Sequence, residues 1–126
     1  MKSPQQAIFD ACYSVSLKNG YSTYDYLPPN KTEYPIVIIS EQFSNDEANK
    51  TSVAGYVTQR INVYNVHTKR SETTDMINNI RRDLRNIKKV EGYNVRINYM
   101  SDQLLIDNST TTPLSRGFLE IEFKFN

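Results

Sequence analysis

The chain has 126 residues and a mass of 14.6 kDa, enough for one domain with a hydrophobic core of its own. Hydrophobic residues make up 38% and charged residues 23%, a balance that excludes an intrinsically disordered chain and a membrane protein. The 15 basic and 14 acidic residues give a net charge of +1, which excludes a nucleic-acid binder that is basic overall, although it allows a local basic patch.

The single cysteine, Cys12, excludes an internal disulfide framework and a cysteine-based zinc site, so we expect it to pack as a small apolar residue. No apolar segment follows Met1–Pro4 as a signal peptide would require. The longest strongly apolar run, Ile36–Ile39, is far shorter than the ~20 residues of a membrane span. We therefore expect a soluble protein made in the cytoplasm.

The first predicted element is a helix that begins at Ser3 and stops at Asn19-Gly20. Ser3 can cap its first turn and Gln6 completes a capping box. Its apolar side chains recur at helical spacing and give one buried face: Ile8, Ala11, Cys12 and Val15.

Three strand candidates follow this helix. Tyr21–Tyr26 predicts a short strand, and Ile36–Phe43 a strand that begins with apolar residues on both faces. The polar segment 44–54 predicts a long, mobile connection. Residues 56–66 alternate, with one side formed by Val57, Ile61 and Val63 and the other by Tyr56, Thr58, Arg60, Asn62 and Tyr64.

The second half of the chain begins with a helix from about Ser71 or Thr74 to Val90, with an apolar stripe of Ile77, Ile80, Leu84 and Ile87. Next comes a strand in which Tyr93, Val95, Ile97 and Tyr99 share one side, and then a polar loop over 102–116. In the last strand Leu119, Ile121, Phe123 and Phe125 point inward, and Glu120, Glu122 and Lys124 outward.

The resulting order, α-β-β-β-α-β-β, predicts an α+β fold of one domain over residues 1–126. We expect a mostly antiparallel or mixed β-sheet with two amphipathic helices packed on one face, because two strand pairs follow one another without an intervening helix.

Catalytic motifs are scarce in this sequence. It has no glycine-rich phosphate loop, and its only histidine, His67, is best interpreted as an exposed turn residue at a strand end. Asp107 followed by Glu122-Phe123-Lys124 resembles the metal-binding core of many nucleases, but alternating charges are also what a half-solvated strand carries. We therefore predict no enzyme activity, no cofactor and no metal. A small DNA-binding or metal-dependent nuclease accessory protein is the alternative.

Charge is divided unevenly along the chain. Residues 69–96 hold eight basic and four acidic residues, a net of +4, whereas residues 21–50 hold five acidic and two basic residues, a net of −3. Arg81, Arg85 and Lys88 recur at helical spacing as a ridge, interpreted either as a solvated helix face or as one half of a contact between identical subunits.

The strand face with Tyr56, Arg60 and Tyr64 has two interpretations of its own. Tyrosine and arginine are favoured on surfaces that a partner covers, but the first helix could also pack there. The candidate subunit-interface residues are therefore Arg81, Arg85, Lys88, Glu41, Tyr56, Arg60 and Tyr64.

One segment order resembles a known family. The chain looks like the tail terminator or tail-completion proteins of long-tailed (siphovirus-type) bacteriophages in the order of five segments. These are Tyr34-Pro35-Ile36-Val37-Ile38-Ile39, a polar segment, Arg60-Ile61-Asn62-Val63-Tyr64, a basic turn, and an amphipathic helix ending in Asp83-Leu84. The N-terminal helix agrees as well. Related folds occur in tail tube and neck proteins, so another neck or head-closure connector subunit is the alternative within the same class.

The resemblance implies structural work without catalysis. Such proteins cap the completed tail tube as a hexameric ring, stop its polymerisation and offer the surface that joins the head. The implied partners are further copies, the tail tube protein, a head-completion or neck protein, and DNA that passes through the lumen without sequence-specific binding; no membrane is involved. The implied location is the head–tail joint of the virion, assembled in the bacterial host cytoplasm.

The two polar segments are expected to be mobile in the free subunit and to order against tube or neck proteins. The free protein would then be largely monomeric. The candidate docking residues in these segments are Asp46, Glu47, Lys50, Asp107 and Arg116.

Overall fold

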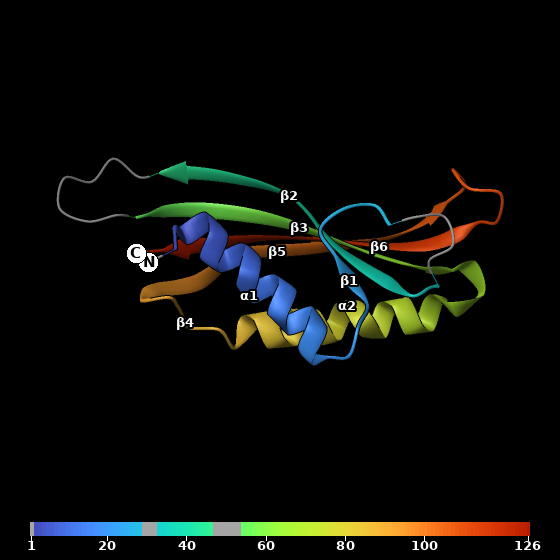
Figure 1. Cartoon of the computed structure of the whole chain (residues 1–126), viewed down its shortest axis with the longest axis horizontal. Helices are drawn as coiled ribbons and strands as arrows, with labels where there is room; N and C mark the ends of the chain where they lie inside the picture. Colours follow the sequence, from blue (N-terminus) through green and yellow to red (C-terminus); the bar gives the residue numbers. More distant parts are fainter. Residues whose placement is uncertain (1, 29–32, 47–53) are drawn as a thin grey trace.

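The described residues form a six-stranded sheet with two helices on one of its faces (Figure 1). The computed structural model describes residues 2–28, 33–46 and 54–126. The elements in chain order are α1 (Pro4–Lys18), β1 (Thr23–Tyr24), β2 (Ile36–Asp46), β3 (Gly55–Val66), a 3₁₀ turn (His67–Lys69), α2 (Arg70–Arg85), β4 (Lys89–Val90), β5 (Tyr93–Asp107) and β6 (Leu114–Phe125). The predicted α+β fold and element order are confirmed, with the short β4 added.

The strand order across the sheet is β1-β2-β3-β6-β5-β4. β1 is parallel to β2, and the other neighbouring pairs are antiparallel. The centre of the sheet is formed by β3 and β6, which pair without a break from Gly55 opposite Phe125 to Val66 opposite Leu114. The mixed, mostly antiparallel sheet is therefore as predicted.

The hydrophobic core lies between the sheet and both helices. Every inward residue predicted for β3 and β6 is no more than 3% exposed: Val57, Ile61, Val63, Leu119, Ile121, Phe123 and Phe125. The helices add Ile8, Cys12, Met76, Ile77, Ile80 and Leu84 to the same cluster. Full burial raises the pKa of Cys12 to about 12, which confirms its role as a small apolar core residue.

The start of α1 is confirmed, although one detail of its cap is wrong. Ser3 Oγ accepts a hydrogen bond from the Gln6 backbone N–H at 3.1 Å. The Gln6 side chain does not complete a capping box, because it donates to the Asp10 carboxylate one turn later at 2.8 Å. A charged acceptor at i+4 competes well with a neutral backbone group.

α2 ends at Arg85, earlier than the predicted end at Val90. The residues beyond it form β4, which pairs with Tyr93 and Asn94 of β5. Glu91 and Gly92 connect the two strands with φ values of 51° and 89°, the left-handed pair that a two-residue hairpin turn needs. The apolar stripe misled the prediction because Ile87 keeps helical spacing and still packs on the core from a non-helical segment.

The predicted loop over 102–116 is also wrong for most of its length. β5 and β6 stay paired as far as Asp107 opposite Leu114, so the connection spans only 108–113. Likewise β2 continues to Asp46, which pairs with Gly55, and residues 47–53 lie outside the described residues. Ser44–Asp46 was mistaken for loop because one face of this sheet is free of helices and accepts polar side chains. In β5 the short apolar run Leu104–Ile106 was grouped with the polar residues that follow it.

The alternation of β5 breaks at Asn98, where the register shifts by one residue. Ile97 lies opposite Phe123 on the core side, whereas Tyr99 lies opposite Glu122 and is 42% exposed. The prediction that Tyr99 shares the inward side with Val95 is therefore wrong, because a bulge turns the following side chains to the other face.

Candidate functional site

The face of the sheet opposite the helices carries the side chains predicted to alternate away from the core. We call this the open face and define it on β3 by Tyr56, Thr58, Arg60, Asn62 and Tyr64. Both helices pack on the other face, in one cluster with the inward residues of β3. The interpretation that the first helix covers the tyrosines is therefore wrong, and the interpretation as a partner surface stays a prediction.

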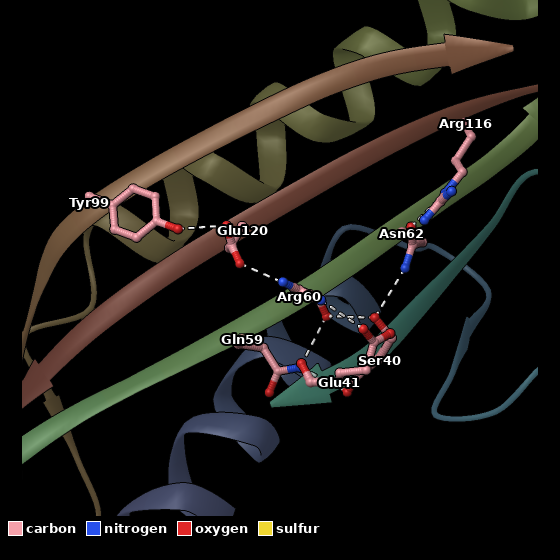
Figure 2. A network of polar contacts seen from close by, with 8 residues as sticks. All are labelled: Ser40, Glu41, Gln59, Arg60, Asn62, Tyr99, Arg116 and Glu120. Atoms are coloured by element: carbon pink, nitrogen blue, oxygen red, sulfur yellow. Dashed lines mark hydrogen bonds and ion pairs between the residues drawn. The ribbon is translucent and has the colours of Figure 1, made fainter. Parts of the chain in front are cut away.

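Arg60 lies at the centre of a polar row that crosses four strands (Figure 2). Its Nε donates to Glu120 Oε1 of β6 at 3.1 Å, and its Nη1 donates to Glu41 Oε2 of β2 at 3.0 Å. Tyr99 of β5 donates its hydroxyl to the second Glu120 oxygen at 2.6 Å. The row therefore joins β5, β6, β3 and β2 by side chains alone.

The contacts of this row change the pKa values of Glu120 and Tyr99. The hydrogen bond from Tyr99 lowers the pKa of Glu120, and the bond from Arg60 adds to that effect. The same Tyr99–Glu120 bond raises the pKa of the Tyr99 phenol, because it favours the protonated hydroxyl beside a carboxylate. The row therefore combines two acidic side chains with one guanidinium and one phenol.

Aromatic rings flank the cations of the open face. The Arg60 guanidinium lies 4.6 Å from the centre of the Phe43 ring and 5.8 Å from that of Phe118. Arg116 lies between Phe118 and Tyr64, at 5.7 and 5.9 Å. These distances are within the range of cation–π attraction, and they hold the long arginine side chains flat over the strands.

Arg116 is fixed and does not belong to a mobile loop as predicted. It is half-buried in β6, and its Nε donates to Asn62 Oδ1 at 2.9 Å. Asn62 in turn donates to Ser40 Oγ of β2 at 3.1 Å, so a second row crosses three strands beside the first (Figure 2). Strand pairing placed Arg116 here, and no local signal in the polar sequence around it indicates that pairing.

The other predicted docking residues divide into two groups. Asp107 is the last residue of β5, and its carboxylate accepts the Ser109 backbone N–H at 2.9 Å. Hydrogen bonds from the Ser109 side chain and from this backbone N–H lower the pKa of Asp107. It borders a cavity of about 640 Å³ at one end of the open face, between Leu27, Tyr64 and Leu114. Asp46 ends β2, and Glu47 and Lys50 lie outside the described residues.

Of the predicted interface residues, Glu41, Tyr56, Arg60 and Tyr64 share the open face, and Glu41 contacts Arg60 directly. The predicted ridge of Arg81, Arg85 and Lys88 does not form as one helical row. Arg81 forms an ion pair with Asp102 of β5, and Lys88 lies beyond the end of α2, where its Nζ donates to the Arg85 carbonyl at 3.3 Å. The helix stops before Lys88 because the chain turns into β4.

The open-face residues missed as site candidates include three aromatic residues: Phe43, Tyr99 and Phe118. Phe118 has the same parity as the outward Glu120, so alternation along the last strand could have found it. Phe43 and Tyr99 each follow a register shift in their strand, and alternation alone puts them on the wrong side.

The nuclease constellation is wrong in its geometry. Asp107 pairs with Leu114, eight positions before Glu122 on the same strand, which is a separation of about 26 Å at ~3.3 Å per residue. Residues so far apart cannot share one metal ion with Lys124. Within residues 2–28, 33–46 and 54–126, no three His, Cys, Asp or Glu side chains form a metal-binding group, and His67 is exposed in the 3₁₀ turn as predicted.

The open face combines arginine side chains with carboxylate, amide and aromatic groups. Its arginines are engaged by carboxylate, amide and aromatic partners, so a nucleic-acid phosphate would have to displace those partners. Flat aromatic and guanidinium groups, half-exposed and held in place by cross-strand bonds, are typical of surfaces that another protein covers. None of the described helices is long and apolar enough to span a membrane.

Other proteins of known structure have a similar fold. The chain superposes on a chain from the virion of a native gene transfer agent particle with a TM-score of 0.68, covering 98% of this chain and 99% of the other at 11% identity. The likeness to this virion chain is one of fold. A second solved structure superposes with a TM-score of 0.59, covering 96% and 92% of the two chains at 9% identity. No family model and no curated protein matches the sequence.

The Glu120 contacts predict an acid-dependent loss of stability. A carboxyl group whose pKa is lowered by folding contributes stability above its unfolded pKa, and that contribution disappears as pH falls through the lowered value. Between about pH 6 and pH 3, we expect the native protein to lose up to ~1 kcal/mol more stability than Glu120→Gln, since solvent screens this half-buried group. Chemical denaturation at several pH values measures the difference, with Glu122→Gln as the control. Identical pH profiles for native protein and Glu120→Gln would contradict the assigned contacts.

Proposed function

We propose that this chain is a structural virion protein that assembles into a ring on the completed tail tube of a long-tailed phage. The ring would end tube polymerisation and present the surface to which the head is joined. The observation that carries the proposal is the superposition on a virion chain over nearly the whole length of both proteins. A match of 98% and 99% coverage favours a shared whole-domain architecture over a shared supersecondary motif.

The open face supports a contact role within such an assembly. Its cross-strand rows stiffen a surface in which aromatic rings and arginines alternate, and neither row contains an activated nucleophile or base. Further copies, the tube protein and a head-completion protein are the partners that this role requires. DNA passing through the ring would meet a protein with a net charge of +1, which suits passage without tight binding.

Deletion of the gene from the parent phage tests this proposal by electron microscopy of the lysate. We expect overlong or headless tail tubes, because nothing would end the tube or join it to the head. Supplying the native protein in trans should restore joined particles.

Two other outcomes would overturn the proposal. Normal tails beside heads that have lost their DNA would assign the chain to head closure, the alternative within the structural class. Fully normal virions would exclude both roles and would favour a DNA-associated accessory function.

A further inference from the structure

The sheet has an open stretch at each of its two edges. β5 is a 15-residue strand, yet β4 pairs only with Tyr93 and Asn94 at its start, and the Val95 N–H reaches the Lys88 carbonyl at 3.0 Å. At the opposite edge, β1 pairs with β2 only at Val37 and Ile38. Along the rest of both edges, no strand of the described chain is paired. Long unpaired edges are templates for another strand, and soluble proteins usually shield them.

Each open stretch carries an exposed aromatic side chain at the same height in the sheet. Tyr99 lies opposite Glu122, Glu122 opposite Thr58, and Thr58 opposite Phe43, so one register row ends in an aromatic ring at both edges. Phe43 is 49% exposed and Tyr99 is 42% exposed, and both are on the open face. The two register shifts create this match, because each turns its aromatic residue away from the core side.

The strand directions at the two edges are opposite. β2 runs antiparallel to β3, β3 to β6, and β6 to β5, so β5 and β2 are antiparallel to each other. A rotation about an axis near the strand direction would therefore bring the β5 edge of one copy against the β2 edge of the next as an antiparallel pair. Repeated contacts of this head-to-tail kind close into rings when the rotation divides a full turn.

Charge also differs between the two edges. A hollow of about 370 Å³ beside the β5 edge is lined by Arg85, Lys88 and Arg96, and no acidic residue is among its described lining residues. At the β2 edge, Glu41 is 61% exposed although it contacts Arg60. Opposite charges at facing edges favour the mixed contact over the contact of two identical edges.

We propose that the β2 edge around Phe43 of one copy pairs with the β5 edge around Tyr99 of the next copy, and that this pairing is the subunit contact of the ring. The inference rests on the proposed function for its closed ring. Backbone hydrogen bonds would supply affinity, and the Phe43–Tyr99 ring pair would set the register.

Cysteine cross-linking tests the contact directly, because the native Cys12 is fully buried and does not interfere. The test mixes two proteins, Phe43→Cys and Tyr99→Cys, at high concentration under oxidising conditions. The mixture is expected to give a disulfide dimer, and each protein alone is expected to stay monomeric. The double variant should give a ladder of multimers, since within one chain the two sites are three strand spacings apart, about 14 Å, too far for a disulfide.

Leu17→Cys mixed with Tyr99→Cys is the matched control, because Leu17 is 53% exposed on α1 and belongs to neither edge strand. Thermal unfolding should show that all variants fold.

A dimer formed by Tyr99→Cys alone would replace the proposed contact with a symmetric β5–β5 contact. A disulfide yield for Phe43→Cys mixed with Tyr99→Cys that is no greater than the yield of the control would overturn the proposed contact. If the native protein forms rings but the mixture of Phe43→Cys and Tyr99→Cys gives no disulfide dimer, only the proposed contact would be overturned. The mixed disulfide together with normal virions after gene deletion would overturn only the proposed function.

Discussion

Phe125→Ala is expected to lower the free energy of unfolding by about 3–5 kcal/mol. Phe125 is 1% exposed, and its ring stacks edge-on against Tyr93 with 6.1 Å between ring centres. It also lies next to the end of the chain, where Asn126 and Asn94 exchange both backbone hydrogen bonds. Removal of the ring would leave a cavity between β6 and β5, and the paired backbone would limit how far the site can collapse.

Urea denaturation monitored by circular dichroism measures this effect, and Phe43→Ala is the matched control. The same ring is removed in both variants, but Phe43 is 49% exposed, so its loss is expected to cost about 1 kcal/mol or less. Equal losses for the two variants would contradict the assignment of Phe125 to the core and of Phe43 to the surface.

Gln59→Leu is expected to destabilise the protein by about 2–3 kcal/mol, although leucine is the more hydrophobic residue. Gln59 is fully buried on the core side of β3 beneath the register shift of β2 (Figure 2). Its Nε2 lies 3.2 Å from the carbonyl oxygens of both Ser40 and Glu41, and its Oε1 accepts from Gln42 at 3.1 Å. Leucine would leave these carbonyl groups without the side-chain donor that satisfies them.

The free energy of unfolding, again from urea denaturation, checks this prediction. Gln103→Leu is the control, because Gln103 is exposed in β5, so we expect a change below about 1 kcal/mol. A Gln59→Leu protein as stable as the native one would mean that water satisfies the carbonyl groups at this irregularity.

The sequence was most informative where one face of an element is apolar. In the last strand, the alternation from Leu119 to Phe125 predicted every buried residue, and the stripe at Ile77, Ile80 and Leu84 predicted the buried side of α2. Burial of apolar side chains is strong enough to fix these faces, and its period is visible within a short stretch of chain.

The sequence was least informative where strands continue into polar segments. Ser44–Asp46 has the composition of a loop, and Leu104–Ile106 is a short apolar run within a longer polar stretch. Both belong to paired strands, because their partner segments in β3 and β6 extend equally far. Backbone pairing with a distant segment stabilises a strand without requiring apolar side chains, and no local pattern reports it.

Gly117 lies where α2 packs closely against the sheet. A Cβ atom at this position of β6 would lie 2.8 Å from Ile77 Cγ1, so α2 approaches the sheet where a side chain is missing. In the sequence the same glycine directly follows the predicted loop, and no local pattern indicates that a helix packs over it. Its purpose is visible only when the helix lies over the strand.

By itself the sequence determined the element types, the two helical faces and the alternation of β3 and β6, because each depends on a repeat within one segment. Only the tertiary structure decided how the outward residues combine. The Tyr99–Glu120–Arg60–Glu41 row draws on four strands; Tyr99 follows one register shift and Glu41 lies within the other. Such a row is set by strand order and register, which arise from pairing between distant segments, and that pairing has no signature in any one of them.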